Sequence, residues 1–174
     1  ALGAGLVNDV RALEREGALE AVRGSGLAVC IMHMQGDPRT MQQEPRYQDV
    51  VSEVGDYLLA RAAICEGEGI ARERLVIDPG FGFGKTLEHN LALFRGLPVL
   101  LGLGYPVLVG VSRKSMIGQL TGRPVHRRLA GGLALATLAM DAGVQIVRTH
   151  DVAATCDALK MVTALRSDPP GAVR

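Results

Sequence analysis

The sequence has almost no surplus of charge and no long apolar run. Its 174 residues include 19 Lys and Arg against 18 Asp and Glu, a net charge of +1. Nucleic acids and acidic membrane surfaces usually bind proteins with a basic surplus, so neither partner is expected. A membrane-spanning helix needs about 20 consecutive apolar residues, and a secretory signal peptide has its own pattern. Neither is found, so we expect no membrane association.

Cysteine is scarce, and its spacing fits neither a disulfide framework nor a zinc site. Cys30, Cys65 and Cys156 are odd in number and far apart, and no CxxC pair occurs. We expect them to pack as small apolar residues in a reduced, cytoplasmic compartment. His33 has no other His, Cys or carboxylate at ligand spacing, so we interpret it as a structural histidine and expect no metal ligand in this chain.

Short apolar runs recur along the chain, each followed by a longer segment. Runs without polar alternation are typical of parallel strands that are covered on both faces. The predicted strands are Gly5–Val10, Leu27–Met34, Arg74–Asp78, Pro106–Val111 and Val144–Thr149.

Helical periodicity marks three of the intervening segments. Apolar residues recur three and four apart over Asp49–Glu66 and again in the segment that ends at Gly143, a helix-ending glycine. Asp151 is placed as the N-cap of a last helix with Val152, Cys156, Leu159 and Val162 on one face. We therefore predict one domain over 1–166 and a frayed tail over 167–174.

Repeated strand–helix units define an α/β fold, with two open alternatives: a flat doubly wound sheet, or part of a TIM (β/α)8 barrel. An eight-stranded barrel needs about 250 residues, so this chain would supply roughly strands 4–8 of an incomplete barrel. Polar residues at the carboxyl end of every strand favour the barrel, because there these ends converge on one mouth. They are Asn8 and Asp9, His33 and Gln35, Asp78, Ser112–Lys114, and Arg148 and His150.

Asp78 opens the segment DPGFGFGKT, where Gly80, Gly82 and Gly84 allow sharp turns and close approach of a ligand. A carboxylate at the end of a buried strand needs partners, since desolvation of an unpaired charge is costly. A simple capping role in a strand–helix turn is the alternative. The glycines do not follow the GxGxxG pattern of dinucleotide sites.

Two further strand ends carry cations. Ser112, Arg113, Lys114 and Ser115 suit an anion or an electron-rich ring, although a solvated basic turn remains open, and the GxxxxGK pattern is absent. Arg148 and His150 lie two residues apart, which puts both on one side of a strand where they can hold a phosphate. The alternative is that the arginine pairs with a core carboxylate.

Taken together, these segments resemble the dihydropteroate synthases of the pterin-binding barrel superfamily. Single motifs are weak, but five strand-end motifs in the family's order are specific. The matching stretches are NDVRAL from Asn8, CIMHMQGDPRTMQQEPRYQDV from Cys30, IDPGFGFGKTLEHNLALFR from Ile77, LVGVSRKSMIG from Leu108, GGLALATLAMDAG from Gly131 and VRTHDV from Val147.

The resemblance implies a reaction in which 6-hydroxymethyl-7,8-dihydropterin pyrophosphate and para-aminobenzoate give 7,8-dihydropteroate and pyrophosphate. It implies catalytic roles for Asp78 and Lys114. It also implies three binding groups, for the pterin, the pyrophosphate and the para-aminobenzoate. The pterin group is Asn8, Met32, Asp78, Gly110 and Lys114. The pyrophosphate group is Arg148 and His150, and the para-aminobenzoate group is Phe83, Lys114 and Ser115.

The resemblance also implies Mg²⁺ on the pyrophosphate, sulfonamides as competitors of para-aminobenzoate, and a homodimer formed through the later helices. The family's first three strand-end motifs, including its Mg²⁺-linked Asn, are not found. The chain starts at Ala1 without a Met. We therefore expect a fragment or processed chain that is inactive alone. Two other functions remain open: a non-catalytic half-barrel that binds a partner, and a methyltetrahydrofolate corrinoid methyltransferase.

Overall fold

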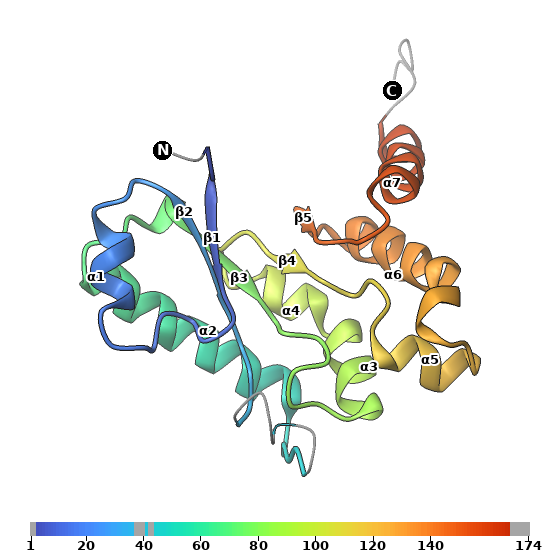
Figure 1. The fold of residues 1–174 in the computed structure, drawn as a ribbon, viewed down its shortest axis with the longest axis horizontal. Helices are drawn as coiled ribbons and strands as arrows, with labels where there is room; N and C mark the ends of the chain where they lie inside the picture. The colour runs from blue at the N-terminus through green and yellow to red at the C-terminus, as the bar shows by residue number, and fades with distance from the viewer. Residues whose placement is uncertain (1–2, 37–40, 42–43, 168–174) are drawn as a thin grey trace.

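The computed structural model describes residues 3–36, 41 and 44–167. Its strands are parallel and neighbour one another in chain order (Figure 1). They are β1 (Leu6–Asp9), β2 (Ala28–Met32), β3 (Leu75–Asp78), β4 (Leu108–Val109) and β5 (Ile146–Val147). The predicted α/β fold with parallel strands is therefore confirmed.

The strands are shorter than predicted, because residues at one or both ends of each run, such as Leu27, Arg74 and Val111, lie outside the ladder. The sheet is also divided into β1–β2–β3 and β4–β5. A single parallel bridge between Ile77 and Val107 joins the two parts, and the Ile77 amide donates to the Pro106 carbonyl at 2.9 Å. The order along the bridged sheet remains consecutive, so all strand ends point to one side.

Helices cover the outside of the strands as an arc, from α1 and α2 at the left of Figure 1 to α6 and α7 at the right. They are α1 (Ala18–Arg23), α2 (Val50–Gly67), α3 (Leu87–Arg95), α4 (Leu97–Leu101), α5 (Ser115–Thr121), α6 (Leu129–Ala142) and α7 (Val152–Arg166), with 3-10 turns at Arg72–Arg74 and Val125–Arg127. The three predicted helices correspond to α2, α6 and α7.

Alternate strand residues pack in two different layers. Val29, Ile31 and Ile77 belong to the large core between the strands and the helices. Cys30, Val76 and Leu108 form a second cluster on the opposite, inner side, with Leu6 and Ile146 against it. Because side chains alternate along a strand, the residues two positions after this inner cluster also face inward at the carboxyl ends. They are Asn8, Met32, Asp78, Gly110 and Arg148.

The predicted end of α6 is confirmed, the side-chain cap predicted for α7 is not formed, and the cap of α2 is a finding of the structure. Asp49 caps α2 by accepting from the amides of Val51 and Ser52, and Gly143 ends α6 in the left-handed conformation with φ of 110°. Asp151 precedes α7, but its side chain makes no cap. Its carboxylate instead binds the Arg113 guanidinium, with Oδ1 at 2.7 Å and Oδ2 at 3.2 Å.

The apolar face predicted for α7 is only partly covered. Val152 is 60% exposed and Cys156 is also exposed, so only Cys30 and Cys65 are buried as predicted. Thr155 is the buried residue of this helix, and its hydroxyl donates to the Asp151 carbonyl at 2.9 Å. Apolar periodicity identifies a face but not what covers it. Here Val152 and Cys156 lie on the surface, whereas Leu159 and Val162 are half-buried.

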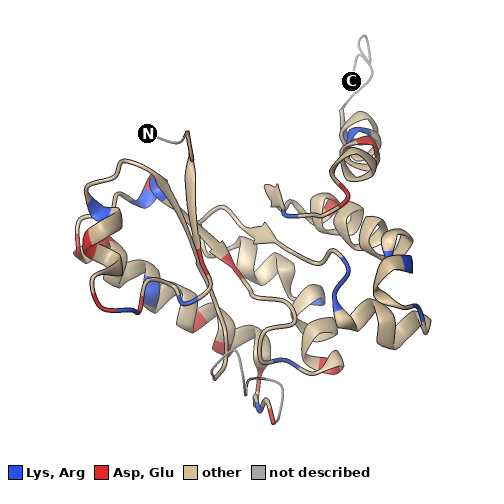
Figure 2. Cartoon of the chain, in the orientation of Figure 1, with Lys and Arg blue, Asp and Glu red and all other residues tan. Residues whose placement is uncertain are grey.

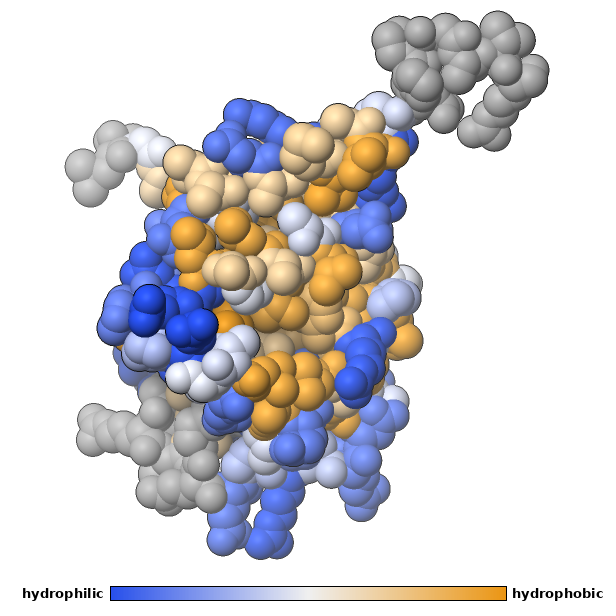
Figure 3. Space-filling view, turned by 90° about the vertical axis from the view of Figure 1, so that its right-hand side faces the viewer, coloured by the Kyte–Doolittle hydropathy of each residue, from blue (hydrophilic) through white to orange (hydrophobic). Residues whose placement is uncertain are grey.

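That surface gathers apolar side chains over the later helices (Figure 3). The large exposed residues there are Leu129, Leu138, Val152, Met161 and Leu165. We call these five residues the α6–α7 face. No helix among the described residues is long and apolar enough to cross a membrane. Of the predicted tail over 167–174, residues 168–174 lie outside the described residues, as do residues 37–40 and 42–43 of the loop after β2.

Candidate functional site

Asp78 ends β3 and is only 1% exposed. Its Oδ1 accepts from the Gly80 amide at 2.8 Å, which is the capping role left open by the sequence. Its Oδ2 lies 3.2 Å from Nη2 of Arg148, yet among the described residues it receives no hydrogen bond of good geometry. Burial raises the pKa of Asp78, while the Gly80 amide, Arg148, Lys114 and Lys85 act in the opposite direction. A buried acceptor atom is thus available to a ligand.

The glycines after Asp78 are required by backbone conformation and by close packing. Gly80, Gly82 and Gly84 have φ of 69°, 77° and 62°, a region that side chains disfavour. A Cβ on Gly80 would lie 1.9 Å from the His33 carbonyl oxygen, and one on Gly84 would lie 2.4 Å from that of Gln35. The loop after β3 therefore packs directly on the chain that follows β2.

Lys114 points back over this loop. Its ammonium lies 4.2 Å from the centroid of the Phe83 ring, a cation–π contact. Burial is the main cause that lowers the pKa of Lys114, followed by Arg148, while Asp78 raises it. The site therefore brings together two residues from different strand ends that the sequence predicted to act together.

A small cavity of about 160 Å³ lies beside the Asp78–Arg148 pair, at the ends of β4 and β5. Its lining residues are Gly110, Ser112, Lys114, Arg148, Thr149 and His150. Ser112 Oγ accepts from the His150 amide at 3.2 Å and lies 3.0 Å from Nδ1 of the same residue. Gly110 leaves room for the guanidinium, because a Cβ there would meet Arg148 Nη2 at 2.7 Å and displace it. Cations, a hydroxyl and backbone at this scale suit a small anion.

The basic turn after β4, which Figure 2 shows in blue, is divided between two directions. Lys114 faces Phe83, whereas Arg113 (φ 59°) turns outward to Asp151. Arg128 Nη1 donates to the carbonyl oxygens of Arg113 and Lys114 at 3.0 and 3.3 Å. Arg113 therefore stabilises the turn through Asp151. The expectation that both Arg113 and Lys114 face an anion at the strand ends is wrong for Arg113.

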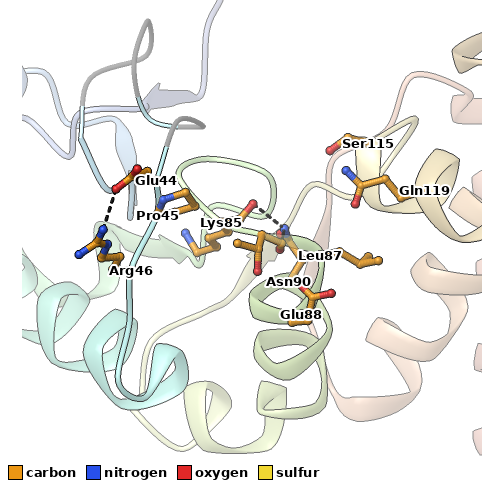
Figure 4. A pocket seen from close by; sticks show the side chains of 10 residues that line it. Glu44, Pro45, Arg46, Lys85, Leu87, Glu88, Asn90, Ser115 and Gln119 are labelled. Carbon is orange, nitrogen blue, oxygen red and sulfur yellow. Dashed lines mark hydrogen bonds and ion pairs between the residues drawn. The ribbon is translucent and has the colours of Figure 1, made fainter.

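The other predicted residues take distinct positions around this centre. Met32 is fully buried and packs under the loop, 3.3 Å from where a Cβ of Gly80 would lie. Asn8 is exposed at the end of β1. Ser115 starts α5 and borders a separate cleft of about 600 Å³ between the loop after β2, α3 and α5 (Figure 4). The structure therefore gathers Asp78, Gly110, Lys114, Phe83, Arg148 and His150 most closely.

Lys85 is a functional candidate that sequence reasoning missed. It is 3% exposed, and its ammonium contacts His33 Nδ1 at 2.9 Å and the carbonyl oxygens of Gly80 and Phe83, both at 3.1 Å. His33 is 6% exposed, which agrees with its predicted structural role. The only sequence signal for Lys85 was its place at the end of the glycine segment.

No group of three or more His, Cys, Asp or Glu residues that could hold a metal ion occurs among the described residues. Asp78 stands as a single carboxylate between cations, which is a poor donor set for Mg²⁺. We therefore derive no chemical step through a metal ion bound to this chain.

The fold and site define a parallel α/β protein with basic side chains lining a cavity at its strand ends. A family model described as "Pterin binding enzyme" matches residues 1–150. The chain therefore belongs to the pterin-binding enzyme family.

The similar proteins are dihydropteroate synthases. That of Escherichia coli (strain K12) is 50% identical over 166 residues, which cover 95% of this chain and 59% of that protein. The Yersinia pestis enzyme in a sulfonamide complex has a TM-score of 0.92 and 46% identity, over 94% of this chain and 60% of that one. The Xanthomonas albilineans enzyme with 7,8-dihydropteroate has a TM-score of 0.89 and 47% identity, over 96% and 63%. This chain thus spans about three fifths of these relatives' length.

Proposed function

We propose that this chain carries the pterin and pyrophosphate portion of a dihydropteroate synthase site. The observation that carries the proposal is the buried, incompletely bonded Oδ2 of Asp78 beside the cavity lined by Lys114, Arg148 and His150. A ring with N–H donors would satisfy the carboxylate, and a pyrophosphate attached to that ring would reach the cations. The sulfonamide and 7,8-dihydropteroate bound by the two solved relatives support the same ligand classes.

In the proposed reaction, the C–O bond between the pterin methylene and the pyrophosphate breaks, and a C–N bond to the arylamine of para-aminobenzoate forms. Positive charge develops on the methylene and the ring, and ionised Asp78 stabilises it. Arg148 and His150 stabilise the departing pyrophosphate. The arylamine is neutral at pH 7 and loses its proton after attack, so no base needs to activate it.

Lys114 and Phe83 would form one wall of the arylamine position. Their cation–π contact holds the ammonium above the ring, and Ser115 lies at the start of α5 just beyond it. Para-aminobenzoate carries a carboxylate, which suits a hydroxyl at a helix start and a nearby ammonium. Sulfonamides would compete because they present a similar arylamine.

We also propose that the five strands belong to an eight-stranded barrel as its strands 4–8. The consecutive parallel order, the inner layer of Cys30, Val76 and Leu108, and the outer arc of helices support this arrangement. Homodimerisation through the α6–α7 face is proposed on the exposed apolar residues of that face. Cytoplasmic localisation and a role for Mg²⁺ with the pyrophosphate remain predictions of the family resemblance.

The experiment measures dihydropteroate formation from both substrates by this chain alone and together with the segment of the Escherichia coli relative that the chain does not match. Turnover with the added segment supports the enzyme, and ligand binding without turnover in either mixture supports a non-catalytic binding module. Methyl transfer from methyltetrahydrofolate to a corrinoid, with no dihydropteroate formed, would assign the chain to the methyltransferase instead.

A further inference from the structure

Lys85 is a buried cation that joins two loops of the mouth. It belongs to the segment after β3, and His33 directly follows β2. The His33–Lys85 contact at 2.9 Å therefore crosses from one strand end to the next. The other contacts, to the carbonyl oxygens of Gly80 and Phe83 at 3.1 Å, close the glycine loop around the ammonium.

These contacts account for the hydrogen-bonding capacity of the ammonium. An ammonium has three N–H donors and no acceptor, and the three partners are two carbonyl oxygens and a ring nitrogen. His33 Nδ1 must therefore be the acceptor, which places the ring proton on Nε2. Burial and the nearby Lys85 lower the pKa of His33 to about 3, so the ring stays neutral.

The held loop carries two residues of the proposed site. Asp78 Oδ1 is bonded to the Gly80 amide, and the Gly80 carbonyl accepts from both Lys85 and the Phe83 amide, the latter at 3.0 Å. Asn90 adds support from α3, because its Oδ1 accepts from the Gly82 amide at 2.7 Å. Removing the ammonium would take a donor from the Gly80 and Phe83 carbonyl oxygens, of which only that of Gly80 keeps another donor within the loop, the Phe83 amide, and would loosen the loop.

Lys85 also supplies charge that does not depend on the ligand. Arg148 is partly exposed and faces the anion cavity, so a bound pyrophosphate would compete with Asp78 for it. Lys85 is fixed by its own partners and is a further cation that favours the ionised form of Asp78. Burial lowers the pKa of Lys85 to about 7, while Asp78 acts to raise it, so this charge is complete only below about pH 7.

We propose that Lys85 is a positioning residue of the mouth, which ties the loop after β3 to the end of β2 and holds Asp78 and Phe83 in their binding positions. The inference rests on the proposed function for the identity of the ligand. The contacts of Lys85 do not depend on the proposed function, so these contacts and the proposed function can be tested separately.

The geometric part is tested on the unmodified chain by nitrogen-15 NMR of its histidine rings between pH 5.5 and 6.5, below the pKa of Lys85 and above that of His33, where the ammonium is charged and the ring is neutral. We expect His33 to show a single tautomer, with an unprotonated, hydrogen-bonded Nδ1 and a protonated Nε2. A protonated Nδ1, or a mixture of tautomers, would overturn the inference. This result needs no pterin binding and no substituted protein.

The positioning part compares Lys85→Met with Lys160→Met, a matched lysine on α7 that is 76% exposed. Affinities are measured for 6-hydroxymethyl-7,8-dihydropterin, which lacks phosphate, and for inorganic pyrophosphate. We expect Lys85→Met to weaken the pterin about tenfold or more and to change pyrophosphate less than about twofold, since lost bonds to a charged group have effects of this size. Lys160→Met should change neither.

Equal loss of both ligands, or no loss of the pterin, in Lys85→Met would overturn the positioning role. Should Lys85→Met fail to fold, the NMR result on the unmodified chain decides the inference. If the unmodified chain shows the expected His33 tautomer but binds no pterin, the proposed function fails while the Lys85 geometry stands. In that case, hydrogen exchange at the Phe83 amide tests the positioning role. We expect exchange to be at least tenfold faster in Lys85→Met than in Lys160→Met.

Discussion

Arg148 and Asp78 form an ion pair across the mouth, with 3.2 Å between Nη2 and Oδ2. The aspartate is almost fully buried, whereas the arginine side chain is 38% exposed and borders the anion cavity. The arginine alone can therefore exchange its partner for a ligand without unfolding the strand end. Without a ligand the two side chains pair with each other. In the proposed complex, Asp78 binds the pterin ring and Arg148 binds the pyrophosphate of the same substrate.

Asp78→Asn keeps the shape of the side chain and removes its charge. We expect kcat to fall by about two to three orders of magnitude, the usual loss when an electrostatic stabiliser of a transition state is removed. The kcat is measured in a mixture of this chain and the complementary segment, under conditions in which the unsubstituted chain forms dihydropteroate. A near-normal kcat would remove Asp78 from the chemistry.

Arg113 and Lys114 are adjacent cations with opposite predicted effects. Lys114→Met should weaken pyrophosphate binding about tenfold, because Lys114 lines the small cavity and carries a charge there. Arg113→Met should change that affinity less than about twofold, because its guanidinium binds Asp151 instead. Calorimetry with pyrophosphate on both variants makes the comparison. A larger loss in Arg113→Met would show that the turn rearranges on binding.

His33 gives a pH dependence of stability with a defined window. Its pKa is lowered from 6.5 to about 3 in the folded chain. Above pH 6.5 the ring is neutral in both states; as the pH falls, the unfolded chain takes up a proton that the folded chain refuses until about pH 3. The free energy of unfolding should therefore drop over this window, by at most about 5 kcal/mol.

His33→Phe isolates this contribution, because it keeps an aromatic ring beside Tyr57 and cannot titrate. Its stability is expected to be lower at pH 7, since Lys85 loses an acceptor, but to change less between pH 6.5 and 4 than that of the unmodified chain. Urea unfolding at several pH values measures both slopes, and titration of other groups cancels in the difference. Parallel slopes would show that His33 does not titrate as described.

The α6–α7 face predicts self-association. Met161→Asp places a charge on a side chain that is 61% exposed and should convert dimers to monomers in sedimentation experiments. Val99→Asp, on α4 and 59% exposed, is the matched control and should leave the mass unchanged. A monomer in the unsubstituted protein, or equal effects of both changes, would contradict the proposed dimer.

The sequence predicted the fold class because parallel strands buried on both faces leave continuous apolar runs, and it predicted most of the mouth because polar residues at their carboxyl ends stand out. It could not predict which neighbours those residues contact. Arg113 and Lys114 look alike in the sequence, but the backbone conformation at Arg113 sends one outward and the other inward. Cys156 shows the same limit in α7. The apolar periodicity predicted which residues share a face, but not that Cys156 on that face is exposed.

Lys85 was missed for a related reason. A lysine after a glycine loop normally reaches solvent, and only the tertiary structure reveals the three acceptors that keep it inside. Asp78 shows the opposite case, since the capping alternative is confirmed through Oδ1, while Oδ2 lies beside Arg148 and its proposed role stays a prediction.

Calorimetry on Arg148→Ala tests the division of the site most directly. The titrations use pterin pyrophosphate and the unphosphorylated pterin alcohol at pH 8, which favours ionised Asp78 once its arginine partner is removed. We predict about ten- to a hundredfold weaker binding of the pyrophosphate ester, the value of a charge-assisted contact. Binding of the alcohol should not weaken, because Asp78 Oδ2 is then released to the ring. Equal losses for the two ligands would show that Arg148 is structural and would contradict the placement of the pyrophosphate.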